Sequence, residues 1–183
     1  MCAFLETAVP RRLVANDSRC PLVVFTDAAL DENNTRAGVG AVMVDGRGNP
    51  ERFLAGIVPS DLLALLQGES PFVINALEVL PVFFVRTLWA DYMRHRRTFI
   101  FIDNDGARHA LLKSSSGSYS VSKVLHHILR TQARSPSFVW YCRVPSLSNI
   151  ADQPSRGVLE TLVSAGAVRD EIPEDLWARA ISG

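Results

Sequence analysis

Two short apolar runs, each followed by an aspartate, constrain the fold of this chain more than any other feature. Leu22 to Phe25 precedes Asp27, and Phe99 to Ile102 precedes Asp103. Each run has the length and apolar content of a buried β-strand. Two such strands lying side by side would deliver both carboxylates to one edge of a sheet. We therefore expect a divalent-metal site at that edge, because hard cations prefer oxygen ligands.

Two further acids lie in comparable positions, Glu78 in VINALEVL and Asp152 in SNIADQPSR. Each of the four also has a plainer explanation. Glu78 follows Asn75 at the spacing of a helix capping box. Asp27 and Asp103 suit turns after strands, and Asp152 suits a cap for the carboxyl-terminal segment. Clustered carboxylates repel one another unless a cation neutralises them, so the presence of all four favours the metal site.

The composition sets modest bounds on the class of protein. The 183 residues are 48% hydrophobic, which is enough apolar material for the core of one compact domain. Lys and Arg together number 19, as do Asp and Glu, so any nucleic-acid-binding surface must be local. The 3 cysteines include no CxxC pair, which argues against a disulfide framework or zinc ribbon and favours a reducing compartment.

Neither a membrane span nor a signal peptide is expected. The most apolar region, Phe72 to Ala90, is interrupted by Glu78 and Arg86. The amino terminus has an early acid, Glu6, and its arginines follow the short apolar stretch instead of preceding it. We therefore expect an intracellular protein, cytoplasmic or nuclear.

Hydrophobic periodicity and turn residues predict an α/β order of elements. Strands are expected over 21–27, 37–45, 51–58, 98–103 and 137–144, the first three as an antiparallel meander. Helices are expected over 60–66, 75–95, 105–113, 120–133, 159–165 and 173–181. Pro81 is expected to kink the long helix or to confine its regular part to the residues after it.

Three parts of the chain follow from these elements. Residues 1–20 are expected to be an amino-terminal extension or linker, residues 21–157 the folded domain, and residues 158–183 a helical carboxyl-terminal tail.

The order of elements and acids resembles that of the ribonuclease H fold, and specifically type 1 ribonuclease H. An Asp lies on the first strand, a Glu in the first long helix, an Asp at the end of the fourth strand and an Asp after the fifth. The segment RVPSLSNIADQPSRG, together with IDND at the fourth strand, resembles the ribonuclease H motifs of hepadnaviral polymerases and DIRS-like reverse-transcribing elements. The resemblance covers about residues 21–157. It implies a five-stranded mixed sheet, with the first three strands antiparallel, flanked by helices.

The resemblance also implies an activity and its metal ligands. Asp27, Glu78, Asp103 and Asp152 would hold two Mg²⁺ ions, which Mn²⁺ could replace, and the RNA strand of RNA:DNA hybrids would be cleaved. One ion would activate a water and the other would stabilise the leaving 3′ oxygen. The products would carry 5′-phosphate and 3′-hydroxyl ends.

Four neighbouring residues are candidates for substrate binding. Asn104 could donate to a ribose or base edge in the minor groove of the hybrid. Asn149, Ser155 and Arg156 could position the last carboxylate or grip a phosphate, although a hydrogen-bonded turn is the simpler explanation for them. A basic helix face could hold the DNA strand or could simply be solvated; its residues are Lys113, Lys123, Arg130 and Arg134.

The order of the acids separates this reading from related nucleases. Proofreading-type exonucleases place Asp-x-Glu on the first strand, whereas Asp27 is followed by two alanines. Integrases and transposases keep their glutamate in a late helix, whereas Glu78 precedes Asp103. The histidine that cellular enzymes carry before the last Asp is missing from residues 145–148, which implies slower turnover.

Domains of this family are usually tethered to a reverse transcriptase, so we expect the chain to be tethered to one or derived from one. As an isolated domain it is expected to be a monomer. The alternative is a catalytically silent scaffold or nucleic-acid-binding module with the same fold. A scaffold would gain nothing from clustered repulsive charge, and the four acids therefore favour the enzyme.

Overall fold

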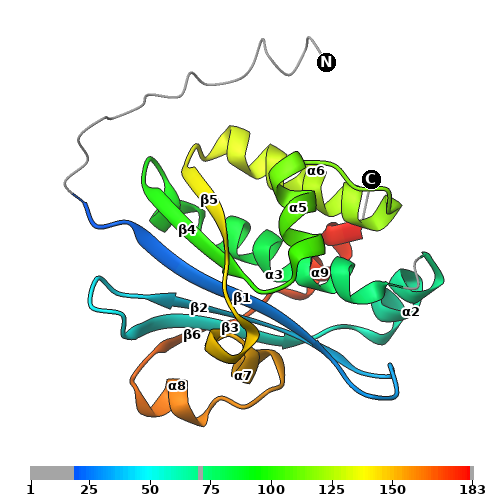
Figure 1. The fold of residues 1–183 in the computed structure, drawn as a ribbon, viewed down its shortest axis with the longest axis horizontal. Helices are drawn as coiled ribbons and strands as arrows, with labels where there is room; N and C mark the ends of the chain where they lie inside the picture. The colour runs from blue at the N-terminus through cyan, green and yellow to red at the C-terminus, as the bar shows by residue number, and fades with distance from the viewer. Residues whose placement is uncertain (1–18, 70–71, 182–183) are drawn as a thin grey trace.

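The computed structural model describes residues 19–69 and 72–181, and these form one mixed sheet with helices on both faces (Figure 1). The sheet has 6 strands in the order β5-β4-β1-β2-β3-β6. Their bounds are β1 Leu22–Leu30, β2 Ala37–Val44, β3 Pro50–Ile57, β4 Arg97–Ile102, β5 Phe138–Arg143 and β6 Val168–Asp170. The first three strands pair antiparallel, while β4 is parallel to β1, β5 to β4 and β6 to β3. The predicted antiparallel meander is thus confirmed.

Two aspartates close the turns of the meander. The carboxylate of Asp31 accepts hydrogen bonds from the backbone N–H groups of Thr35 and Arg36. Asp45 accepts in the same way from the backbone N–H groups of Arg47 and Asn49. Such side-chain-to-backbone bonds replace the ladder bonds that the turn cannot make, and they fix the register of the strands on either side.

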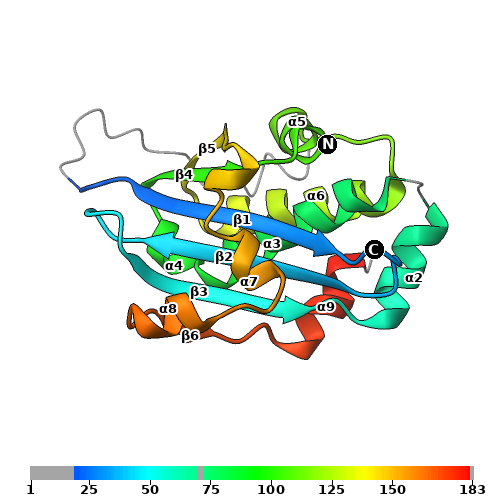
Figure 2. The ribbon, with the colours of Figure 1, turned by 60° about the horizontal axis from the view of Figure 1, so that its bottom comes forward.

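The helices form two unequal layers. Their bounds are α2 Ser60–Glu69, α3 Val73–Leu88, α4 Ala90–Met93, α5 Asp105–Lys113, α6 Tyr119–Arg134, α7 Asp152–Ser155, α8 Glu160–Ser164 and α9 Glu174–Ile181, with a 3₁₀ turn at Ser146–Ser148. In Figure 2, α3, α6 and α9 lie behind the sheet, and the short helices α7 and α8 lie in front of it. The main core lies between the sheet and α3, which is buried along most of its length. Within the described residues, no helix is long and apolar enough to cross a membrane.

The expectation of five strands is wrong by one, because β6 adds a sixth beside β3. Asp170 of β6 receives a bidentate ion pair from Arg52 and a hydrogen bond of 2.8 Å from the indole Nε1 of Trp89. A strand of 3 residues is too short for alternation to reveal it in a sequence. The tail beyond Gly157 contains the two predicted helices, α8 and α9, and Trp177 of α9 packs edge-on against Phe84.

Pro81 does not confine the long helix. α3 begins at Val73 and continues through Pro81 to Leu88, so the residues before the proline are helical too. A proline removes only one backbone hydrogen bond, and burial of this helix against the sheet outweighs that loss. The helix ends earlier than expected, because the backbone of Trp89 leaves helical geometry. Trp89 is 1% exposed, and its Nε1 donates a hydrogen bond to Asp170.

Gly40 on β2 allows α7 to lie directly against the sheet. A Cβ atom added at Gly40 would be 2.5 Å from the backbone N of Ser155 and 2.7 Å from the carbonyl oxygen of Ala151. We expect Gly40→Ala to lower the free energy of unfolding by about 1–3 kcal/mol, because the backbone of α7 must move away. Urea unfolding measures the change. Gly68→Ala is the matched control. Its site in α2 is open, so that variant should be at least as stable as the parent. Equal stability of the two variants would refute the close packing of α7 on Gly40.

Candidate functional site

The register of β1 and β4 brings Asp27 and Asp103 together. The last parallel pair between the two strands is Thr26 with Ile102, so both aspartates follow it directly. The sequence predicted that the first strand ends at Asp27. In the structure β1 continues to Leu30, because it pairs with β2 beyond that point. The carboxylates still emerge side by side, since the pairing with β4 stops where expected.

Glu78 completes a compact group of three acids. It lies in the middle of α3, which packs against β1, and ligand oxygens of Asp27, Glu78 and Asp103 all lie within 4.8 Å of one another. Phe72 is the N-cap of this helix, so a capping box between Asn75 and Glu78 is excluded. We call Asp27, Glu78 and Asp103 the acid trio.

Burial and repulsion from neighbouring carboxylates raise the pKa values of two members of the acid trio, Asp27 and Glu78. Burial raises the pKa of Glu78 well above its ordinary value, and the charges of Asp27 and Asp103 raise it further. Burial also raises the pKa of Asp27 to about 6, with smaller contributions from Asp103 and Asp152. One carboxylate oxygen of Glu78, Oε2, is buried without a hydrogen-bond partner among the described residues. A cation bound between the three carboxylates would offset their mutual repulsion and the free-energy cost of burying them.

Asn149 and Ser155 hold Asp27 in place. Asn149 Nδ2 donates to Asp27 Oδ1 at 3.1 Å and to the carbonyl of Thr26 at 3.1 Å. Ser155 Oγ lies 2.5 Å from Asp27 Oδ2 and 2.8 Å from the carbonyl oxygen of Asp152. Both side chains are buried, at 5% and 4% exposure, so they contact the first carboxylate and not the solvent.

Asp152 lies at the rim of the acid trio. It begins α7, its side chain is 43% exposed, and its Oδ1 accepts a hydrogen bond of 3.0 Å from Arg156 Nε. Its charge still raises the pKa of Asp27, while that of Arg156 lowers it. The four predicted acids therefore separate into three that converge and one that is paired with an arginine nearby.

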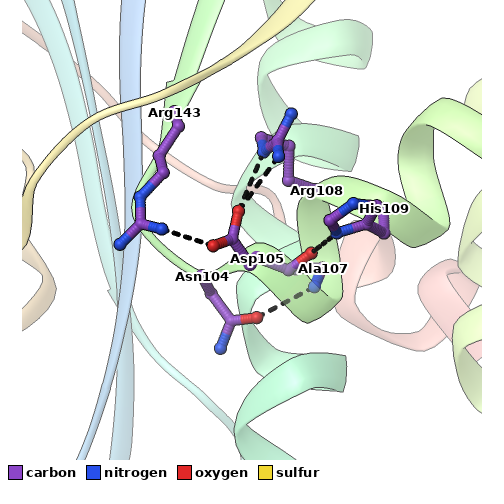
Figure 3. A network of polar contacts seen from close by, with 6 residues as sticks. All are labelled: Asn104, Asp105, Ala107, Arg108, His109 and Arg143. Carbon is purple, nitrogen blue, oxygen red and sulfur yellow. Dashed lines mark hydrogen bonds and ion pairs between the residues drawn. The ribbon is translucent and has the colours of Figure 1, made fainter.

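Asn104 and a network around Asp105 border the site next to Asp103. Asn104 Oδ1 caps α5 by accepting from the backbone N–H of Ala107 at 2.9 Å. Figure 3 shows Arg108 and Arg143 approaching the carboxylate of Asp105 from two sides. No role was predicted from the sequence for Asp105, Arg108 or Arg143. The spacing of Asp105 and Arg108 was a local indication, but Arg143 comes from β5 and needed the topology.

Asn75, for which the sequence offered a helix capping box with Glu78 as an alternative, also lies at the border of the site. It lies one turn before Glu78 on α3, and a Cβ atom added at Gly106 would be 2.8 Å from its Oδ1. Asn75 therefore borders the start of α5, close to Asp103. Its spacing of one helical turn from Glu78 was the available indication.

The donor set of the acid trio fits a hard divalent cation. Three carboxylates supply oxygen ligands only, and an unpaired buried oxygen is available for coordination. Asp152, at the rim, could add a fourth carboxylate. This residue set suits magnesium or manganese better than a metal that prefers thiolate or imidazole.

The pKa of Asp27 predicts how the metal-free protein responds to pH. A carboxyl group whose pKa rises on folding stabilises the fold below its unfolded pKa, and that contribution is lost as pH increases through the folded value. For Asp27 the window runs from 3.8 to about 6, and the loss corresponds to roughly 3 kcal/mol.

We therefore expect Asp27→Asn to gain stability relative to the parent between pH 4 and pH 7 in EDTA, as measured by urea unfolding. The asparagine can keep both hydrogen bonds, accepting from Asn149 and donating to Ser155. Glu32→Gln, which removes an exposed acid in the β1–β2 turn, serves as control. If the difference in free energy of unfolding between Asp27→Asn and the parent stays constant across this pH range, the raised pKa of Asp27 is contradicted.

Solved structures resemble this chain along most of the domain. Ribonuclease H1 isolated from compost by a metagenomic approach superposes with a TM-score of 0.61 at 13% identity, over 78% of this chain and 98% of that one. Ribonuclease H1 from the halophilic archaeon Halobacterium salinarum gives a TM-score of 0.61 at 15% identity, over 78% and 99%. This chain has the ribonuclease H fold. The predicted α/β class and mixed sheet are thus confirmed, with the sixth strand as the correction.

One further comparison concerns a ligand. The compost ribonuclease H1 has also been solved in complex with an RNA/DNA hybrid, and that structure superposes with a TM-score of 0.62 at 12% identity, over 78% of this chain and 99% of that one. No protein-family model and no curated protein sequence matches the chain.

Proposed function

We propose that this protein is a metal-dependent endonuclease that hydrolyses the RNA strand of RNA:DNA hybrids. The observation that carries the proposal is the acid trio, in which carboxylates on β1, on α3 and directly after β4 have ligand oxygens within 4.8 Å of one another. Its buried and unpaired Glu78 oxygen is costly in the absence of a cation. The ribonuclease H fold supports the choice of substrate, since solved relatives of that fold include one bound to a hybrid.

In the proposed mechanism, Asp27, Glu78, Asp103 and Asp152 would hold two magnesium ions. The ions would supply a water activated for in-line attack and would stabilise the leaving 3′ oxygen. Asn149 and Ser155 keep the Asp27 carboxylate oriented before metal arrives. Arg156 keeps Asp152 beside the acid trio through its ion pair.

The bordering residues are proposed to bind the hybrid. Asn104 uses its Oδ1 as a helix cap, which leaves its Nδ2 hydrogens for a ribose 2′-hydroxyl or a base edge. Arg156, exposed at the rim, would contact a phosphate of the hybrid. Arg108 and Arg143, oriented by Asp105, would add positive potential along the same border.

We also propose that the domain derives from a reverse-transcribing element. The support is the sequence motif RVPSLSNIADQPSRG, which resembles the last ribonuclease H motif of such elements. The test is the encoding locus: polymerase-like sequence upstream in the same reading frame would support the origin, and a complete stand-alone reading frame would count against it.

The proposed activity is tested with end-labelled hybrid, duplex RNA and duplex DNA of one sequence, each incubated with the protein in Mg²⁺, Mn²⁺ or EDTA. We expect cleavage of the RNA strand in the hybrid alone, only with metal, leaving 5′-phosphate and 3′-hydroxyl ends. If hybrid is bound but not cut under either metal, the silent-scaffold alternative is favoured. Cleavage of duplex RNA at the same rate would contradict the proposed substrate.

A further inference from the structure

Part of the front face of the sheet is not covered by any helix in the described part of the chain. α7 and α8 cover β2 and β3, where Val42 and Phe53 pack against Ala151 and Leu162. In Figure 2 these short helices lie in front of β2 and β3, while β4 and β5 beyond β1 have no helix in front of them. On this face Phe99 and Phe101 of β4 are half-buried, and Trp140 of β5 is exposed.

These outward side chains include a row of aromatic rings. Along β4, Thr98, Ile100 and Ile102 are buried, so the alternating Phe99 and Phe101 face the other side of the sheet. Phe101 stacks on Phe25 of β1, with ring centroids 5.0 Å apart and an interplanar angle of 17°. Phe25 is half-buried and marks the edge of the row, because it also packs against the cluster under α7 and α8. Phe99 packs on Trp140 of β5 at 5.5 Å, and Trp140 is 48% exposed. We call Phe25, Phe99, Phe101 and Trp140 the aromatic row.

The aromatic row runs between a basic end and the acidic site. At the amino ends of β1 and β4 lie the basic residues Arg19, Arg96 and Arg97, which donate to the backbone carbonyls of His95, Cys20 and Arg19 respectively. Arg96 Nε donates to the carbonyl of Cys20 at 2.9 Å, which holds the guanidinium beside the sheet without neutralising its charge. At the carboxyl ends, Phe25 and Phe101 are each two residues before a member of the acid trio.

We propose that the aromatic row binds single-stranded nucleic acid, with bases stacked on the rings and phosphates held by the arginines at the amino ends of β1 and β4. Residues two apart on one strand are about 6.6 Å apart, which gives successive bases separate rings. The four-stranded sheet of RNA-recognition-motif domains binds single strands in this way, with bases stacked on aromatic side chains of its open face. The charge arrangement selects this occupant, because an apolar protein partner would not require a basic end. The binding goes beyond the proposed hybrid cleavage, since stacking needs neither metal nor a scissile bond.

The test uses a fluorescent oligothymidylate of about 15 nucleotides, a length suited to one platform, titrated with the protein in EDTA. DNA is chosen so that ribonuclease activity cannot alter the probe. We expect binding with quenching of tryptophan fluorescence, because Trp89 and Trp177 are buried and Trp140 is the exposed tryptophan. Trp140→Leu should weaken binding about tenfold, and Trp140→Phe should retain it. Arg96→Gln should reduce the slope of log affinity against log salt by about 0.7.

Tyr119→Leu is the matched control, since Tyr119 is 67% exposed on α6, on the opposite side of the sheet. Equal losses for Trp140→Leu and Tyr119→Leu would overturn the proposal, as would no binding by the parent. Self-association that Trp140→Leu abolishes, without oligonucleotide binding, would assign the face to a second copy of the chain and also overturn it. Melting temperatures of all variants verify that they are folded. Because hybrid cleavage is measured separately in magnesium, loss of either activity is distinguishable from loss of the other.

Discussion

Asp103→Asn is expected to lower the rate of hybrid cleavage by roughly a thousandfold or more while leaving the fold intact. The variant removes one of three converging carboxylates, and a catalytic metal contributes several kcal/mol to transition-state stabilisation. Its melting temperature in EDTA should equal or exceed that of the parent, because one source of repulsion on Asp27 and Glu78 is gone. Single-turnover cleavage of labelled hybrid in Mg²⁺ measures the rate.

Asp105→Asn is the matched control for this variant. Asp105 is two residues away and its carboxylate pairs with Arg108 and Arg143 outside the acid trio. We expect it to retain cleavage within about tenfold of the parent, since it positions arginines at the border and does not ligate metal. Equal activity of Asp103→Asn and the parent would remove the acid trio from the mechanism.

A chain ending at Gly157 is expected to lose its cooperative unfolding transition. The truncation removes α9, whose Leu176 and Trp177 are 2% and 8% exposed in the core, and it removes β6 with Asp170. Emptying two such sites costs about 5 kcal/mol or more, which is comparable to the whole stability of an ordinary domain. Arg52 would in addition lose its bidentate carboxylate partner. Circular dichroism during urea unfolding measures the loss.

Asp175→Ala in the full chain is the control, because its side chain is 72% exposed and pairs with Arg179 at 3.8 Å. We expect that variant to unfold like the parent. A truncated protein with the same midpoint as the parent would show that residues 158–183 are not part of the folding unit.

Much of the fold could be predicted because its elements have strong periodic patterns. The helix expected over 105–113 is α5, Asp105–Lys113, and the meander strands lie where alternation and turn residues predicted them. β6 was missed because 3 residues carry no period, and its partners Arg52 and Trp89 are distant in sequence. Pro81 misled the prediction because tertiary burial of α3 overrides the local preference.

For the site too, features set by local sequence could be predicted, and contacts between residues distant in sequence could not. The proximity of Asp27 and Asp103 could be predicted, since each follows an apolar run and such strands pair in sheets. The roles of Asn149 and Ser155 as partners of Asp27 could not, because these contacts span more than a hundred residues. The pairing of Asp152 with Arg156 is local, but whether that acid points to the trio or to the arginine depends on how α7 lies on Gly40.

The central claim, that the acid trio is a divalent-metal site, is tested most directly by titrating the protein with Mn²⁺ and following free Mn²⁺ by electron paramagnetic resonance. We expect saturable binding by the parent and by Asp105→Asn, and its loss in Asp103→Asn. The same titration counts the bound ions. Absence of saturable binding by the parent, or equal binding by Asp103→Asn, would contradict the account.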